Sequence, residues 1–220
     1  MTGNILKIIA AIAMVTDHVG LMFFPQNLLL RIIGRLAFPI FAFMIAEGCH
    51  YTRNRRRHFG QLFGLAVACQ IVYFLAAGDL YLSILFTFSL SVLTIYALQF
   101  CKAKPGPLSG LVFAATVATV YVLNQVVEID YGFWGCMAPV FAAILRDTKF
   151  YTLRRSVTML GIGLVFLALA TGGIQIFALA ALPLLYCYSG QRGKVKMKYF
   201  FYIFYPAHLA LLQLVAWFWA

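Results

Sequence analysis

Residues 5–24 read ILKIIAAIAMVTDHVGLMFF, an apolar run that contains two adjacent ionisable residues, Asp17 and His18. A hydrocarbon core about 30 Å thick is crossed by about 20 helical residues, so this run is long enough to span a membrane. An aspartate at the centre of such a helix costs about 2.5–3.5 kcal/mol on insertion scales, and intramembrane charges are therefore functional by default. Asp17 and His18 mark the first place to look for a site.

The composition supports a membrane interpretation of the whole chain. Of the 220 residues, 64% are hydrophobic and 10% are charged, with no polar stretch long enough for a soluble domain. We therefore expect an all-α, polytopic integral membrane protein in which residues 1–220 form one transmembrane domain. About nine transmembrane helices are predicted, with a range of eight to ten because the sixth and eighth are short. Their ranges are Ile5–Phe24, Leu28–Tyr51, His58–Ala77, Leu80–Phe100, Leu108–Val127, Tyr131–Leu145, Leu153–Ala170, Ile174–Ser189 and Tyr199–Ala220.

The distribution of charge predicts the orientation. Fifteen of the seventeen lysines and arginines fall in five regions that a nine-helix arrangement places on one side: Lys7, Arg53–Arg57, Lys102/Lys104, Arg146–Arg155 and Arg192–Lys198. The positive-inside rule makes that side the cytoplasm, so the N-terminus is predicted to be cytoplasmic. The opposite connections carry three acids and no basic residue: Pro25–Asn27, Ala77–Asp79, Glu128–Asp130 and Thr171–Gly173.

The two remaining basic residues, Arg31 and Arg35, lie in the second predicted helix. Arg35 lies seven residues from the outer end of that helix, a depth of about 10 Å at 1.5 Å per residue. Asp17 lies at a similar depth, and so does Gln70 of the third helix, with His208 of the ninth nearer the midplane. A water-accessible polar cavity among these four helices would explain all of them.

Each of these residues also has a structural interpretation. Asp17 and Arg35 would form an ion pair that fixes the packing of two helices, and Gln70 would make an interhelical hydrogen bond. His18 would be a neutral imidazole bonded to a carbonyl group. Arg31 would extend to the outer interface rather than take part in a site.

A second polar group is predicted at the inner ends of the helices. Its basic members are Arg53, Arg55, Arg56, Arg57, Lys102, Lys104 and Arg146. These residues either orient the protein and attract anionic membrane lipids, or they hold the phosphates of a cofactor. Glu47, nearby, would pair with a neighbouring arginine.

Other chemistries lack a sequence signal. The five cysteines are scattered, and no close ligand spacing of the HExxH kind is present, so no metal site is predicted. The net charge of +11 is spread over loops, as membrane orientation requires, and nucleic-acid binding is not expected.

Several sequence blocks together resemble the TraX family over nearly the whole chain. They are LKIIA at 6–10, VTDH at 15–18, GRLAFPIFA at 34–42, YG at 131–132 with Gly135, and FYPAHLA at 204–210. The resemblance implies a multi-pass protein of the inner (cytoplasmic) membrane, associated with conjugation, that acetylates the N-terminus of a pilin subunit. The family is more loosely similar to membrane-bound acyltransferases, which take acetyl-CoA from the cytoplasm.

The resemblance implies a role in acetyl transfer for each of these polar residues. His18 is expected to act as general base, with His208 as the rival base. Arg35 would hold the acyl group or the developing oxyanion, and Asp17 would pair with Arg35. The seven basic residues named above would bind the phosphates of acetyl-CoA, an assignment that rests on charge and not on a family motif.

Two other functions remain open from the sequence. Asp17, Arg35 and His208 would also suit the proton relay of an ion-coupled transporter. A non-enzymatic pilin assembly factor, which binds pilin within the membrane, is the third possibility. The sequence does not tell a peptide amine from a sugar or lipid hydroxyl as the acceptor, and the oligomeric state is unknown.

Overall fold

The computed structural model describes residues 1–78, 80–195 and 197–219, and within these ranges it is helical with no β-strand. The predicted all-α class is therefore confirmed. Three residues named in the predicted connections and helices, Asp79, Lys196 and Ala220, lie outside the described residues.

The apolar segments expected from the sequence are present as helices. Six of them are long and apolar enough to cross a membrane: Gly3–Phe23, Leu28–Tyr51, Arg55–Leu75, Ile84–Ala103, Pro107–Val126 and Leu153–Thr171. Three shorter apolar helical segments, Gly132–Ala143, Gly173–Tyr186 and Ile203–Phe218, match the sixth, eighth and ninth predicted helices. The chain is thus a multi-pass membrane protein by helix length and composition, while nine crossings and a cytoplasmic N-terminus stay predictions.

The chain folds into two compact units. The first consists of residues 1–41 and 172–220, and the second of residues 42–171. A single domain over residues 1–220 stays a prediction. The first unit contains α1 (Gly3–Phe23), α2 (Leu28–Gly34), the start of α3 (Ala37–Tyr51), the 3-10 helix η1 (Gly173–Ala181), α9 (Leu182–Tyr186) and α10 (Lys198–Trp219).

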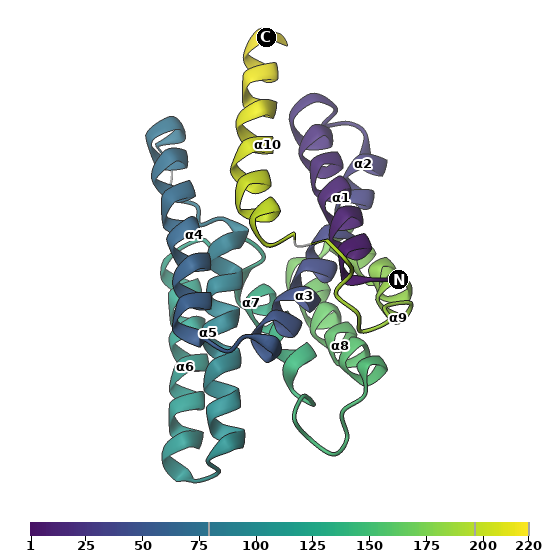
Figure 1. Cartoon of the computed structure of the whole chain (residues 1–220). Coiled ribbons are helices and arrows are strands. Elements are labelled where there is room, and N and C mark those ends of the chain that lie inside the picture. The colour runs from purple at the N-terminus through teal and green to yellow at the C-terminus, as the bar shows by residue number, and fades with distance from the viewer. Residues whose placement is uncertain (79, 196, 220) are drawn as a thin grey trace. The chain divides into compact units, whose positions relative to one another are not determined.

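In the first unit, α1 and α2 form a hairpin of two helices side by side (Figure 1). Two glycines allow this close packing. A Cβ atom at Gly20 would lie 2.8 Å from the Cβ of Leu30, and one at Gly34 would lie 2.3 Å from the Cβ of Asp17. The hairpin also packs against two distant segments, because α10 contacts α1 and η1 contacts α2.

The predicted second helix, Leu28–Tyr51, is interrupted at Arg35 and Leu36. The cause lies three residues into α3, where Pro39 has no N–H to donate to the carbonyl of Arg35, so the helical ladder is broken there. The amide of Arg35 donates to the carbonyls of Arg31 and Ile32 at 3.2 and 3.1 Å, which closes α2 with a tight turn. The interruption places Arg35 at a helix end within an otherwise continuous apolar segment.

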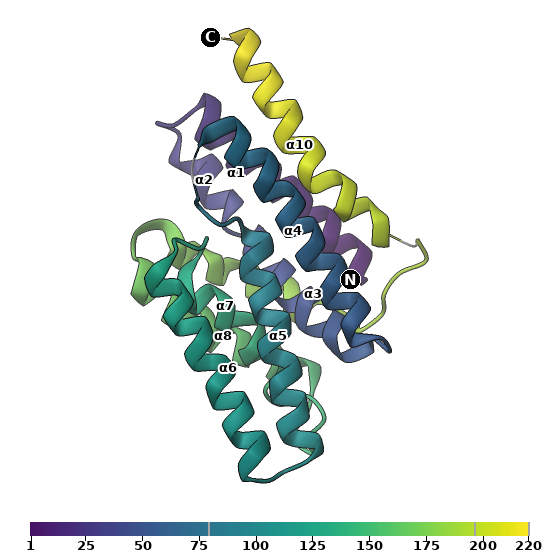
Figure 2. The same cartoon turned by 90° about the vertical axis from the view of Figure 1, so that its left-hand side faces the viewer.

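The second unit holds α4 (Arg55–Ala77), α5 (Ile84–Ala103), α6 (Pro107–Val126), α7 (Gly132–Ala143) and α8 (Leu153–Thr171), together with most of α3. Figure 2 shows α5 and α6 running side by side. The short α7 packs against both α5 and α8. The Ser91 hydroxyl crosses from α5 to α7, where it donates to the carbonyl of Cys136 at 2.7 Å.

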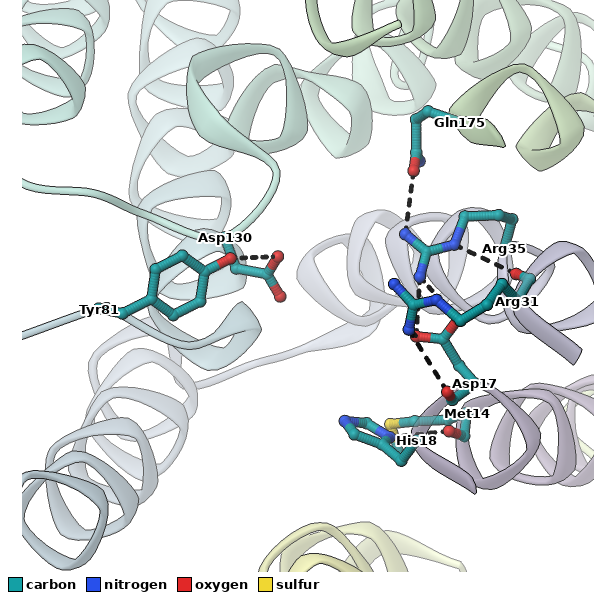
Figure 3. Close-up of polar contacts among 8 residues, drawn as sticks. All are labelled: Met14, Asp17, His18, Arg31, Arg35, Tyr81, Asp130 and Gln175. Carbon is teal, nitrogen blue, oxygen red and sulfur yellow. Dashed lines mark hydrogen bonds and ion pairs between the residues drawn. The ribbon is translucent and has the colours of Figure 1, made fainter. Parts of the chain in front are cut away.

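Two connections of the second unit are hydrogen-bonded to each other near Asp130. The Tyr81 hydroxyl donates to the Asp130 carboxylate at 2.9 Å (Figure 3), and the Thr87 hydroxyl donates to the Asp130 carbonyl at 2.6 Å. Burial, and next the Asp130 carboxylate, raise the pKa of Tyr81, so its hydroxyl stays protonated and remains a donor. These bonds join the α4–α5 connection to the α6–α7 connection.

Candidate functional site

The carboxylate of Asp17 binds two arginines, Arg31 within α2 and Arg35 directly after the end of α2. Arg35 Nη2 lies 2.6 Å from Oδ1 and 2.7 Å from Oδ2, and Arg31 Nη1 lies 3.0 Å from Oδ2 (Figure 3). The predicted pair of Asp17 with Arg35 is therefore confirmed. The prediction that Arg31 extends to the interface is wrong, because its side chain turns back to the carboxylate. Charge-assisted bonds of this length are the stronger class of hydrogen bond, and they occupy both oxygens of Asp17.

Gln175 of η1 extends this network. Arg35 Nη1 donates to Gln175 Oε1 at 3.2 Å, and Arg35 Nε donates to the Arg31 carbonyl at 3.4 Å. Gln175 is 6% exposed, and its Nε2 has no partner among the described residues. The sequence pointed instead to Gln70, which lies in the second unit and donates to the Tyr81 carbonyl at 3.1 Å. A lone glutamine in the apolar run after Gly173 was the signal that would have found Gln175.

The two histidines of the first unit make the same local hydrogen bond. Nδ1 of His18 lies 2.8 Å from the Met14 carbonyl, and Nδ1 of His208 lies 2.8 Å from the Phe204 carbonyl. Because a carbonyl oxygen only accepts, Nδ1 carries the hydrogen in both rings. In the neutral imidazole this leaves Nε2 with a lone pair, which is the form that a proton acceptor needs.

These two histidines, which the sequence predicts as alternative general bases, lie in contact in the structure. Their ring centroids are 5.1 Å apart in an edge-to-face arrangement. His208 is 7% exposed, it stacks on Phe204, and its Nε2 is buried with no partner in the described part of the chain. His18 is only half-buried. The side chain of His18 is therefore more accessible than that of His208.

The basic residues expected at the inner ends of the helices differ in whether their side chains bind other groups of the protein. Arg146 Nη1 lies 2.6 Å from Glu47 Oε1 in a buried pair, and it also contacts the Tyr151 hydroxyl. Glu47 thus pairs with an arginine, as expected, but one that lies 99 residues away in sequence. Lys102 Nζ donates to three carbonyls at the end of α7, those of Ala143, Ile144 and Arg146.

The other basic residues of that group are exposed: Arg53, Arg55, Arg56, Arg57 and Lys104. Of these, Arg55 lies over the ring of Tyr96, with 5.5 Å from its guanidinium carbon to the ring centroid. The binding of CoA phosphates by any of the seven stays a prediction, and the exposed five are the better placed because Lys102 and Arg146 already hold internal partners.

The predicted cavity among four helices also stays a prediction, since its third helix, α4, belongs to the second unit. The first unit has a hollow of about 550 Å³ over the turn between α1 and α2, lined by residues 23–29. Its lining includes none of the four residues Asp17, His18, Arg35 and His208.

Comparison with known proteins finds a family and several relatives that match nearly the whole chain. Residues 2–216 match the family described as TraX protein. The probable fimbrial assembly protein FimC, serogroup H1, of Dichelobacter nodosus is 30% identical over 94% of this chain and 92% of its own length. Two proteins named TraX from Escherichia coli are 25% and 27% identical, each over 97% of this chain and 86% of their own length. No solved structure matches the chain.

Proposed function

The chain belongs to the TraX family, and from this premise we propose that it is an acetyltransferase of the cytoplasmic membrane, which transfers the acetyl group of acetyl-CoA to the N-terminus of a pilin subunit. The activity is the one that the family resemblance implies. The geometry of the first unit supports it with a base and an adjacent cationic group.

The observation that carries the proposal is the hydrogen bond from His18 Nδ1 to the Met14 carbonyl. This bond fixes the ring and leaves Nε2 as the basic atom. A base held in this way takes the proton from an attacking amine as the amine adds to the acyl carbonyl, a role that contributes about 10²–10⁴-fold to rate in known enzymes. His208, packed edge to face against it, holds the ring of His18 in place.

Asp17 and Arg35 have a positioning role in this scheme. Both carboxylate oxygens of Asp17 accept bonds from arginine, so this residue does not serve as the base. Arg35 in turn joins Asp17 to Gln175, which ties α1, the end of α2 and η1 into one polar network. The network sets the position of α1 at the residue directly before His18.

In this proposal the phosphates of the acyl donor bind to basic residues of the second unit. The exposed residues Arg53, Arg55, Arg56, Arg57 and Lys104 suit the phosphates of CoA, because guanidinium groups bind phosphate oxygens in pairs. The family name and the name of the fimbrial assembly relative support pilin as the acceptor.

The test is transfer of label from radiolabelled acetyl-CoA to pilin, in membranes that contain pilin and equal amounts of each variant. Wild type should label the pilin N-terminus and release CoA thiol. His18→Ala should lose about 10²-fold or more of this activity, since the base is gone. His50→Ala is the matched control and should retain full activity, because His50 pairs with Asp147 in the second unit.

A non-enzymatic role in pilus assembly is the second function to test, because one relative is named a fimbrial assembly protein. A pure assembly factor would support piliation with His18→Ala and would release no thiol from acetyl-CoA. Absence of both label and thiol release with wild type, in the presence of pilin, would reject the acetyltransferase.

A further inference from the structure

The partly buried cluster of Asp17, Arg31 and Arg35 in the first unit carries one net positive charge. Asp17 is the only acid in residues 1–41 and 172–220, and two arginines share its carboxylate. A carboxylate carries one negative charge and two guanidinium groups carry two positive charges, so the cluster is cationic. A partly buried, uncompensated charge is costly unless an opposite charge reaches it. The cluster is therefore suited to bind an anion.

The two arginines differ in how many of their donors are used. Arg35 donates through Nε, Nη1 and Nη2 to the Arg31 carbonyl, Gln175 and Asp17. Arg31 donates through Nη1 alone, to Asp17, and in the described part of the chain its Nε and Nη2 have no hydrogen-bond partner. The Arg31 side chain is also more exposed, at 21% against 12% for Arg35. Arg31 is thus the arginine with donors available for a ligand.

Arg31 also lies close to the expected base. Its Nη1 is 3.4 Å from the backbone carbonyl of Asp17, which belongs to the peptide bond that joins Asp17 to His18. Figure 3 shows the guanidinium of Arg31 and the ring of His18 extending from their helices to the same side. One ligand on this side would therefore face both groups.

These observations lead us to infer that Arg31, and not Arg35, is the catalytic arginine that binds the acyl oxygen. The inference rests on the proposed acetyltransferase. The lone pair of the acceptor amine forms a bond to the thioester carbon, and the π pair of the carbonyl moves onto its oxygen, opposite Arg31. The C–S bond then breaks, the carbonyl re-forms, and the sulfur leaves as thiolate. The amine proton passes to Nε2 of His18 and then to the thiolate, so the products are an amide and CoA thiol.

The experiment compares Arg31→Gln and Arg31→Lys with Arg192→Gln, an exposed control of the same charge change in the first unit. Two quantities are measured: the kinetics of acetyl transfer to pilin, and inhibition by a trifluoromethyl ketone analogue of acetyl-CoA, whose hydrate carries a tetrahedral oxyanion. Arg31→Gln should lower kcat by about 10²–10³-fold, the usual effect of losing an oxyanion donor, with little change in KM. Inhibition by the analogue should weaken by a similar factor.

Arg31→Lys keeps the charge but loses the planar fork, so its kcat should fall by about tenfold. If Arg31→Gln fails to fold, the lysine variant carries the same test with the charge balance intact. A kcat and an inhibition constant equal to those of Arg192→Gln, in whichever Arg31 variant folds, would overturn this inference and leave the acetyltransferase standing. Absence of acetyl transfer by wild type would overturn both.

Discussion

Gly34 lies directly against the side chain of Asp17. A Cβ atom at residue 34 would be 2.3 Å from both Cβ and Oδ1 of Asp17, a separation that no pair of non-bonded atoms tolerates. The absence of a side chain at Gly34 therefore allows the carboxylate to sit between α1 and α2, within reach of Arg31 and Arg35. The polar site depends on this one close approach as much as on its charges.

Replacing Gly34 with alanine should separate α1 from α2 and break the contact of Asp17 with the arginines. We expect a loss of about 1–3 kcal/mol in the free energy of unfolding, as for other overpacked positions, and loss of acetyl transfer. Thermal unfolding in detergent measures the first effect. Gly64→Ala in α4, where nothing lies within 4 Å of the added Cβ, is the control and should unfold at the wild-type temperature or above. Equal stability of the two variants would contradict the close contact.

Replacing Asp17 with asparagine should be more harmful than replacing either arginine. It leaves two guanidinium groups side by side with no carboxylate. Removing one partner of a fully buried ion pair costs about 3–5 kcal/mol, so this partly buried cluster should lose less than that. Adding Arg31→Gln to Asp17→Asn should recover part of the lost stability, because only one guanidinium then remains. Glu128→Gln, an exposed acid, serves as the control for the loss of a carboxylate. A double variant less stable than Asp17→Asn would show that the two arginines do not repel.

The pair of Glu47 and Arg146 should be strongly coupled, and the pair of His50 and Asp147 weakly coupled. The side chains of the first pair are 10% and 8% exposed, and those of the second are 32% and 45% exposed. A double-mutant cycle of Glu47→Gln and Arg146→Gln should give a coupling of about 1–3 kcal/mol. The cycle for the second pair should give less than about 1 kcal/mol, as exposed pairs do. Equal couplings would mean that burial does not set the strength of these pairs.

His208→Ala should leave more activity than His18→Ala. His208 Nε2 is buried with no partner in the described part of the chain, while the half-buried His18 is the more accessible ring. We expect about a tenfold loss of kcat for His208→Ala, because His18 loses a packing partner but keeps its bond to Met14, against about 10²-fold or more for His18→Ala. Acetyl transfer at matched expression gives both values. The reverse order would make His208 the base.

Some of this arrangement follows from the sequence alone. Apolar segments of about 20 residues predict membrane helices because lipid does not hydrogen-bond the backbone, and six of the predicted segments are long enough. The equal depths of Asp17 and Arg35 predicted their ion pair, because helical rise converts residue number into depth. The residue blocks around Asp17, Arg35 and His208 also predicted the family to which the chain belongs.

Tertiary structure decided the rest, since depth does not say which way a helix is rotated or which helix is its neighbour. No pattern of residues indicates that η1 lies beside α2 or that Arg31 turns to Asp17, so neither the contact made by Gln175 nor the role of Arg31 is predictable from the sequence. Rotation of α2 turns Arg31 toward Asp17, and packing of α10 against α1 brings His208 to His18. Residue depth leaves these choices open, so the contacts that bring the site's residues together come from helix packing and from the close approach at Gly34.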